Sequence, residues 1–337
     1  MGKNITVTLF GESHGKGVGA LLTGMPPHIP VDAVAIERAL ARRRPRGDYA
    51  TARRELDPWD ILSGTYRGKT TGDPIAIWIP NKDVKSEDYD HMPYRPGHGD
   101  YTAHVKSFGA DDPRGGGYRS GRLTAPLVVA GAMANTLLEQ QNIKITSRIT
   151  EIGGETDPLK QKKALEQAKK EGDSLGGMVH LTISGVPTGM GGPREASAQS
   201  ALAHALYAVG AVKSVAFGAG DTAARLRGSE NNDPYIEEKG KIKAASNHAG
   251  GTLSGITTGD AIEITVAVKP TPSIAKPQHT VDREGKNTVL EIAGRHDTAL
   301  VGRIPVVLES AAALTILDLW MERQKEIALR EKTGERS

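Results

Sequence analysis

The chain of 337 residues contains no cysteine. This absence excludes disulfides, thiolate nucleophiles and cysteine-ligated metals, and it suits a reducing compartment. Aromatic residues make up only 4% of the sequence, whereas glycine supplies 40 residues. We therefore expect ligands to be held by backbone amides and by arginines in loops, more than by aromatic stacking platforms.

A strong charge of one sign is also missing. The 43 basic and 40 acidic residues leave a net charge of +3, so no overall field directs the protein to nucleic acid or to a membrane. No apolar run reaches the roughly 20 residues that span a bilayer, and the first residues lack the apolar segment of a signal peptide. The sequence thus predicts a cytoplasmic protein with neither a nucleic-acid nor a membrane partner.

The first stretch that carries chemical groups is Gly-Glu-Ser-His-Gly at residues 11–15, directly after an apolar run at 5–10. A strand that stops on a glycine and then presents Glu12, Ser13 and His14 delivers acid–base groups and a hydroxyl to one point in space. Because short motifs recur by chance, a polar turn with a solvated histidine is an equal alternative for these five residues alone.

A cluster of arginines follows a predicted helix that Asp32 caps and whose apolar side holds Ile36 and Leu40. The cluster exceeds what a helix C-terminus needs for its dipole, which favours an anion site. A solvated basic face or a nucleic-acid patch is the alternative interpretation. The six residues are Arg42, Arg43, Arg44, Arg46, Arg53 and Arg54.

Two further loops combine glycines with charged groups. In the first, two glycines bracket His98, and Arg95 and Asp100 flank it, so a ligand could approach the imidazole closely. A merely solvated histidine is the alternative. In the second loop, Arg-Gly-Gly-Gly-Tyr-Arg-Ser-Gly-Arg at 114–122 precedes an apolar helix predicted at 124–138. A glycine-rich loop at the N-terminus of a buried helix attracts phosphate.

The remaining pattern predicts a mixed α and β fold. Hydrophobic periodicity predicts helices at 157–171 and 195–209, and strands at 61–66, 75–79, 143–152, 178–186, 215–219, 223–227 and 262–268. Near the end, Gly-Arg-His-Asp at 294–297 leads into a second apolar helix at 304–320. Because this repeats the order found at 117–138, we predict an internal pseudo-two-fold with two buried helices in the centre and sheets outside them.

In order and over nearly the full chain, these segments resemble chorismate synthase. The resemblance rests on residues 11–15, 42–54, 95–98, 120–122, 247–251, 269–271 and 294–297. It implies an α+β fold, a β-α-β sandwich with central buried helices flanked by antiparallel sheets. It also implies a single domain over 1–322, a charged C-terminal helix or tail over 323–337, and a homotetramer.

The resemblance further implies a lyase of aromatic amino acid biosynthesis. Its reaction is the 1,4-anti elimination of phosphate from 5-enolpyruvylshikimate 3-phosphate to give chorismate, the last common step of the shikimate pathway. The cofactor is reduced FMN, with no net redox change, and an external NAD(P)H-dependent system reduces the flavin.

The family pattern also implies a set of site residues. His14 would neutralise the leaving phosphate, His98 would be the proton source beside the flavin, and Asp297 would be the base, acting with flavin N5. Substrate and flavin phosphate together carry about six negative charges, which guanidiniums can bind in two-pronged fashion. The substrate-binding candidates are Arg43, Arg44, Arg46, Arg53, Arg122 and Arg295. The flavin-binding candidates are Tyr118, Arg119, Ser120, Gly210, Ala211, Ser254, Lys269, Pro270, Thr271, Pro272, Ser273 and Arg295, and no metal site is implied.

The sequence departs from the family pattern at several of these positions. Leu123 stands where relatives usually have an acid, Gly210 where Asn is common, and Ser254 where Gly is common.

Three other classes of function stay open. A nucleic-acid-binding module at 42–54 is opposed by the balanced charge and few aromatics. A flavin reductase or other net redox enzyme is opposed by the lack of a Gly-x-Gly-x-x-Gly fingerprint after a strand. A phosphohydrolase at Arg295 and His296 is the third.

Overall fold

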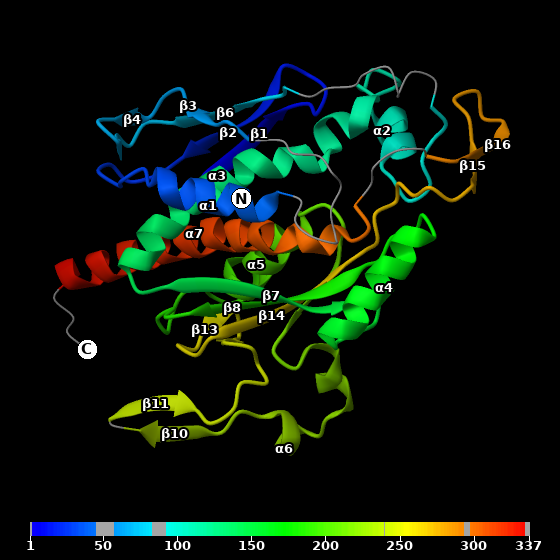
Figure 1. Ribbon diagram of the computed structural model, residues 1–337. Coiled ribbons are helices and arrows are strands. Elements are labelled where there is room, and N and C mark those ends of the chain that lie inside the picture. Colours follow the sequence, from blue (N-terminus) through cyan, green and yellow to red (C-terminus); the bar gives the residue numbers. More distant parts are fainter. Residues whose placement is uncertain (1, 45–56, 83–91, 239, 293–296, 334–337) are drawn as a thin grey trace.

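Two long helices lie side by side in the middle of the molecule, between two antiparallel sheets (Figure 1). They are α3 (Thr124–Gln140) and α7 (Ile304–Thr333). The computed structural model describes residues 2–44, 57–82, 92–238, 240–292 and 297–333. A Cβ on Gly131 of α3 would lie 2.3 Å from Cβ of Ser310 of α7, so only glycine lets the two helices approach this closely.

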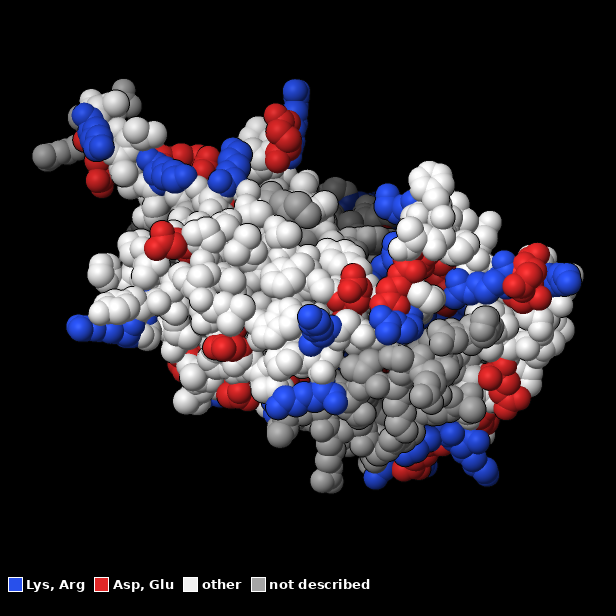
Figure 2. Space-filling model, turned by 90° about the horizontal axis from the view of Figure 1, so that it is seen from above, with Lys and Arg blue, Asp and Glu red and all other residues white. Residues whose placement is uncertain are grey.

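The first sheet has the strand order β1-β2-β6-β3. Its strands are β1 (Thr6–Gly11), β2 (Gly17–Thr23), β6 (Ile75–Pro80) and β3 (Asp60–Ile61). In β6 the isoleucines Ile75, Ile77 and Ile79 are fully buried and alternate with half-buried residues, which is the period of a strand with one face on the core. On the opposite face, the rings of Phe10 and Trp78 stack with centroids 6.3 Å apart. Charged side chains are sparse on the face seen from above this sheet (Figure 2).

The second sheet has the order β7-β8-β14-β9. Its strands are β7 (Lys144–Ile152), β8 (Gly177–Ser184), β14 (Ile262–Val268) and β9 (Val212–Phe217). Every second residue of β14 is buried, and Ile264 pairs with Leu181 of β8 on the core side. Both sheets cover α3 and the first part of α7, up to Leu317, and these parts are accordingly apolar nearly all round.

The two halves of the chain repeat one topology. Counted along the chain, the first strand of each sheet pairs with the second, the second with the fourth, and the fourth with the third. A helix joins the second and third strands in each half: α1 (Ala33–Arg43) in the first and α5 (Ala198–Tyr207) in the second. A long central helix then follows the fourth strand. The predicted α+β sandwich with central buried helices and a pseudo-two-fold is therefore confirmed.

Shorter elements decorate this frame. The helices are α2 (Asp100–Lys106), α4 (Pro158–Lys170) and α6 (Gly228–Asn231). Four two-stranded ribbons pair β4 (Thr65–Tyr66) with β5 (Lys69–Thr70), β10 (Tyr235–Glu238) with β11 (Lys241–Ala244), β12 (Thr252–Leu253) with β13 (Ile256–Thr257), and β15 (Gln278–Val281) with β16 (Asn287–Leu290). The short 3-10 segments are η3 (Arg114–Arg119), η4 (Gly121–Leu123), η5 (Arg194–Ala196), η6 (Gly220–Arg225) and η7 (Leu300–Gly302).

Two strand predictions are wrong. The segment predicted at 223–227 lies in and after η6, because Gly218 and Gly220 have φ values of 54° and 56° and turn the chain out of the sheet after β9. The strand predicted at 61–66 breaks at Gly64, whose φ is 79°, so β3 and β4 are separate. The helix predicted at 195–209 begins only at Ala198, where Ser197 caps it.

The last helix is longer than its apolar part. No glycine or proline follows Pro305 until Gly334, so α7 continues through the charged residues to Thr333. By length and composition alone α7 could cross a membrane. However, 61% of its most apolar 18-residue stretch is buried inside the fold, as expected of a core helix. The division into a domain at 1–322 and a charged helix or tail at 323–337 stays a prediction.

Candidate active site

One large cavity brings together groups that are far apart in the sequence. It has a volume of about 1310 Å³, and His14, His98, Arg122 and Asp297 all line it. These residues come from the loop after β1, the loop before α2, η4 and the segment before η7. The pseudo-two-fold explains why these distant segments come together. The segments that precede the two central helices end at the same side of the sandwich.

Most of the other predicted site residues line the same cavity. They are Arg43, Arg44, Tyr118, Arg119, Ser120, Gly210, Ala211, Lys269, Thr271, Pro272 and Ser273. Pro270 and Ser254 do not. Ser254 is at the tip of the β12–β13 ribbon with a φ of 52°, followed by Gly255 with a φ of 81°, so its position is set by a tight turn that favours glycine. Arg46, Arg53 and Arg295 lie outside the described residues.

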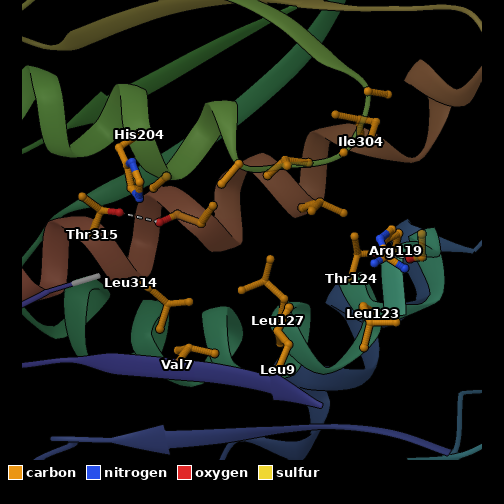
Figure 3. A pocket seen from close by; sticks show the side chains of 18 of the residues that line it. Val7, Leu9, Arg119, Leu123, Thr124, Leu127, His204, Ile304, Leu314 and Thr315 are labelled. Atoms are coloured by element: carbon orange, nitrogen blue, oxygen red, sulfur yellow. Dashed lines mark hydrogen bonds between the residues drawn. The ribbon is translucent and has the colours of Figure 1, made fainter. Parts of the chain in front are cut away.

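The cavity has a polar part and an apolar part. Figure 3 shows the apolar part, with Val7 and Leu9 of β1 and Leu127 of α3 on one side and Ile304 of α7 on the other. Arg119 and Thr124 lie at the end of this view near Leu123, and His204 and Thr315 lie at the opposite end. This combination of an apolar wall with a few convergent polar groups is typical of sites for small molecules.

His14 is oriented by its neighbour. Its Nδ1 is 3.0 Å from the hydroxyl of Ser13, and that hydroxyl donates to the carbonyl of Arg114 at 3.2 Å. Because the hydroxyl has a single proton, its oxygen can accept from an N–H at Nδ1 while the proton goes to Arg114. The Ser13 amide also donates to the carbonyl of Gly117 at 3.2 Å, which joins the loop after β1 to η3.

The glycines of η3 make room for both imidazoles. Gly115, Gly116 and Gly117 have φ values of 59°, 91° and 52°. A Cβ on Gly115 would lie 2.1 Å from Cε1 of His14, and one on Gly116 would lie 3.2 Å from Cε1 of His98. The three glycines therefore do more than expose backbone amides: they allow His14 and His98 to lie on either side of one short segment.

We expect Gly115→Ala to displace the His14 ring and to lower kcat/KM by about 10²-fold, because a shift near 1 Å is enough for such a loss. Steady-state kinetics on the two variants Gly115→Ala and Gly154→Ala measures this. Gly154 is the matched control, since its φ is 86° and, apart from its chain neighbours, no atom of the described residues lies within 4 Å of a Cβ built there. Equal activity in both variants would show that the contact with His14 has no role.

His98 is held by a buried carboxylate. Nδ1 of His98 is 2.6 Å from Oδ1 of Asp100, and Arg95 donates to both oxygens of Asp100 at 2.7 Å. Burial alone raises the pKa of Asp100, but the hydrogen bonds from Arg95 and His98 outweigh it and hold that pKa well below its usual range. The charged carboxylate fixes the Nδ1 edge of the ring, so the Nε2 edge is the one available for proton transfer.

The Asp100 interactions predict a pH dependence of stability. The pKa of Asp100 is lower in the folded chain than in the unfolded chain, so its contribution is complete above the unfolded pKa of about 4 and is lost as the pH falls further. We expect Asp100→Asn to lower the free energy of unfolding at pH 7 by about 3 kcal/mol. Urea unfolding across pH 7 to 3 measures the difference in free energy of unfolding between the unaltered chain and Asp100→Asn, and this difference should shrink below about pH 4. A difference in free energy of unfolding that stays constant with pH would contradict the lowered pKa of Asp100.

The three arginines of the cluster that the structure describes divide into two parts. Arg42 does not line the cavity: its guanidinium makes two hydrogen bonds of 2.5 and 2.6 Å to Glu309 of α7. Arg43 and Arg44 do line it, and Nε of Arg44 is buried without a hydrogen-bond partner among the described residues. An unsatisfied buried guanidinium nitrogen is a donor ready for an anion.

A second group of cavity residues follows β14. Lys269 donates to the carbonyl of Gly97 at 2.5 Å, and burial together with the charge of Lys213 lowers the pKa of Lys269. The hydroxyl of Thr271 is buried and has no partner within the described part of the chain. Ser273 is also buried. These residues give the cavity a cation and hydroxyls beside the His98 loop.

Sequence reasoning missed two charged cavity residues that contact predicted site residues. Arg303 places Nε 3.3 Å from Oδ2 of Asp297, and Asp57 contacts both Arg43 and Arg122. An acid just after the arginine cluster was the signal for Asp57, and the spacing of six residues from Asp297 was the only signal for Arg303. No group of three or more His, Asp or Glu in the described residues could hold a metal ion.

The sequence and the fold are similar to those of known chorismate synthases. A family model described as chorismate synthase matches residues 5–321. Chorismate synthase from Thermococcus kodakarensis is 42% identical over 346 residues, which covers 96% of this chain and 98% of that protein. The one from Pyrococcus abyssi is 44% identical over 341 residues, with 94% and 96% covered. A crystal structure of chorismate synthase matches with a TM-score of 0.75 and 27% identity over 96% of this chain and 93% of that one.

Proposed function

This chain belongs to the chorismate synthase family, whose members are carbon–oxygen lyases, and from this premise we propose its reaction. The chain eliminates phosphate from 5-enolpyruvylshikimate 3-phosphate in a 1,4-anti sense and yields chorismate, with reduced FMN and no net redox change. The observation that supports this most is the shared cavity, which two histidines, an aspartate and several arginines line together.

The residues of the cavity fit a flavin nucleotide. A planar ring needs an apolar slot, and its phosphate needs cations and hydroxyls. The cavity offers the apolar wall around Leu127 and a polar set at Tyr118, Arg119, Ser120, Lys269 and Thr271. The buried, unpartnered hydroxyl of Thr271 is a group that a polar ligand would satisfy. When bound, reduced FMN supplies electron density that assists loss of phosphate and is returned afterwards.

The arginines of the cavity bind the anions of the substrate. Arg43, Arg44 and Arg122 stay protonated, and their guanidiniums match phosphate and carboxylate geometry. Arg46, Arg53 and Arg295 belong to the same proposed set, although they lie outside the described residues. Together they replace the water that the substrate loses on binding.

The two histidines handle protons. We assign to His14 the stabilisation of the leaving phosphate, where an imidazolium is well matched near neutral pH. His98, fixed through Nδ1 by Asp100, is the proton source on the flavin side. The glycines of η3 keep both rings near the reacting atoms.

Asp297 accepts the proton that leaves the substrate ring. A base must be fixed in orientation to act within hydrogen-bond reach, and the guanidinium of Arg303 at 3.3 Å from Oδ2 holds the carboxylate in place. Loss of this proton and loss of phosphate together form the new double bond, so the substrate undergoes elimination without oxidation.

The wider setting is proposed from the same family resemblance. The enzyme is cytoplasmic, receives reduced flavin from a separate NAD(P)H-dependent system, and assembles as a homotetramer. The stacked rings of the exposed Phe10 and the half-buried Trp78 support association through the first sheet.

The test is an anaerobic assay with 5-enolpyruvylshikimate 3-phosphate and FMN, either reduced by dithionite or left oxidised. We expect chorismate absorbance to appear only with reduced FMN. No product in either case would overturn the proposal. Oxidation of NADPH by the pure protein with free FMN would instead indicate a flavin reductase.

A further inference from the structure

Asp57 is a buried carboxylate at the wall of the cavity. It is only 1% exposed, and it lies between the end of α1 and η4. Aspartate is almost never fully buried unless charged partners surround it. The reason for its burial must therefore be sought in the groups that it contacts.

Asp57 contacts two arginines of the cavity, one with each oxygen. Nη1 of Arg43 donates to Oδ2 at 3.2 Å, and Nη1 of Arg122 donates to Oδ1. Arg43 precedes Asp57 by 14 residues and Arg122 follows it by 65. One carboxylate thus joins two guanidiniums that reach the cavity from different elements.

Each guanidinium has a second anchor on another edge. Nε of Arg43 donates to the hydroxyl of Thr124 at 2.9 Å, and Nε of Arg122 donates to Oδ1 of Asn81 at 3.1 Å. A guanidinium is planar, so hydrogen bonds on two edges fix both its position and the orientation of its plane. Asp57 supplies the edge that the two arginines have in common.

We propose that Asp57 is a positioning residue that sets the relative geometry of Arg43 and Arg122 for binding an anionic group of the substrate. This inference rests on the proposed function, because it assigns the two arginines to the substrate. Both guanidiniums and Asp57 line the cavity. Asp57 acts through the arginines and does not touch the substrate.

The variant Asp57→Asn tests the proposal because it keeps the shape of the side chain. The amide oxygen can still accept from one guanidinium, but the amide NH₂ is a donor and faces the other guanidinium unfavourably. We expect kcat/KM for 5-enolpyruvylshikimate 3-phosphate to fall about 10²-fold, mainly through a higher KM. The Kd for FMN should change by less than about twofold, because its proposed contacts do not involve Asp57.

The matched control is Asp60→Asn, since Asp60 is an exposed aspartate three positions further on. It should leave KM, kcat and the FMN Kd at the values of the unaltered protein. A folded Asp57→Asn protein with unchanged KM would overturn the proposal, as would an equal loss of substrate and FMN binding, which is the mark of a general structural defect.

A second pair of variants keeps the proposal testable if Asp57→Asn does not fold. Thr124→Val and Asn81→Ala remove the hydrogen bond at Nε of Arg43 and of Arg122 respectively. Nη2 of each arginine keeps its bond to a backbone carbonyl. Thr124→Val is the primary variant of the pair, because Asn81 also donates to the carbonyls of Glu12 and Gly15. Each should raise KM about tenfold, with the FMN Kd unchanged. Unchanged KM in both would overturn the proposal.

Binding of inorganic phosphate separates this inference from the proposed function. We expect phosphate to bind the unaltered chain more tightly than Asp57→Asn in a calorimetric titration. If the unaltered chain makes no chorismate but this difference persists, the proposed reaction fails and the positioning role stands. If chorismate is made and phosphate binds both proteins equally, the positioning role fails and the reaction stands.

Discussion

Replacing His14 or His98 by alanine is expected to lower kcat by about 10²-fold or more, which is the usual contribution of a positioned acid or base. The two losses have different origins. In His14→Ala the leaving phosphate loses its cationic partner, whereas in His98→Ala the proton source on the flavin side is lost. Stopped-flow measurement of chorismate formation under anaerobic conditions gives both rates.

The fold should survive both changes. His14 and His98 are half-buried at a cavity wall and contribute little to the apolar core. Thermal unfolding checks this directly. His279→Ala is the matched control, because His279 is exposed on β15 and does not line the cavity. A rate equal to that of the unaltered chain in either active-site variant would remove that imidazole from the mechanism.

The second large effect is expected for Asp297→Asn, which should retain FMN but lose elimination by about 10³-fold. The amide has the same shape as the carboxylate and can still accept a hydrogen bond from Arg303, so the cavity keeps its form. It cannot take a proton at neutral pH. Titration with FMN and a single-turnover reaction separate binding from chemistry.

The control for this change is Asp221→Asn, since Asp221 is exposed in η6 and does not line the cavity. It should leave both FMN binding and turnover unaltered. Retained elimination in Asp297→Asn would show that the base lies elsewhere. Loss of FMN binding together with elimination would show that Asp297 has a structural role in the cavity.

The elements with a strict period were the ones that sequence reasoning found. The alternation in 262–268 predicted β14, and the apolar run at 75–79 predicted β6. Asp32 predicted the start of α1 as its cap, and the helix predicted at 157–171 is α4, which Asp157 caps. Hydrophobic patterning fails to predict the secondary structure where a backbone turn redirects the chain. The apolar residues at 223–227 resembled a strand, but two glycines with positive φ before them redirect the chain.

The site could be predicted only in part. Ordered motifs indicated His14, His98, Arg122 and Asp297, because each stands beside glycines or other charged groups. Contacts between residues that are far apart in the sequence gave no signal in the sequence itself. The fit of the His14 ring against Gly115 joins positions that are 101 residues apart, and the link of Asp57 to Arg122 spans 65. Such pairs depend on the packing of the two central helices, which periodicity does not describe.

The most direct measurement follows phosphate, chorismate and flavin absorbance together in one anaerobic reaction that contains a known amount of reduced FMN. The two histidines, the aspartate and the arginines in a single cavity predict phosphate and chorismate in equal amounts, with the flavin still reduced when the reaction ends. Phosphate without chorismate, or flavin oxidised in proportion to the product, would contradict elimination chemistry at this site.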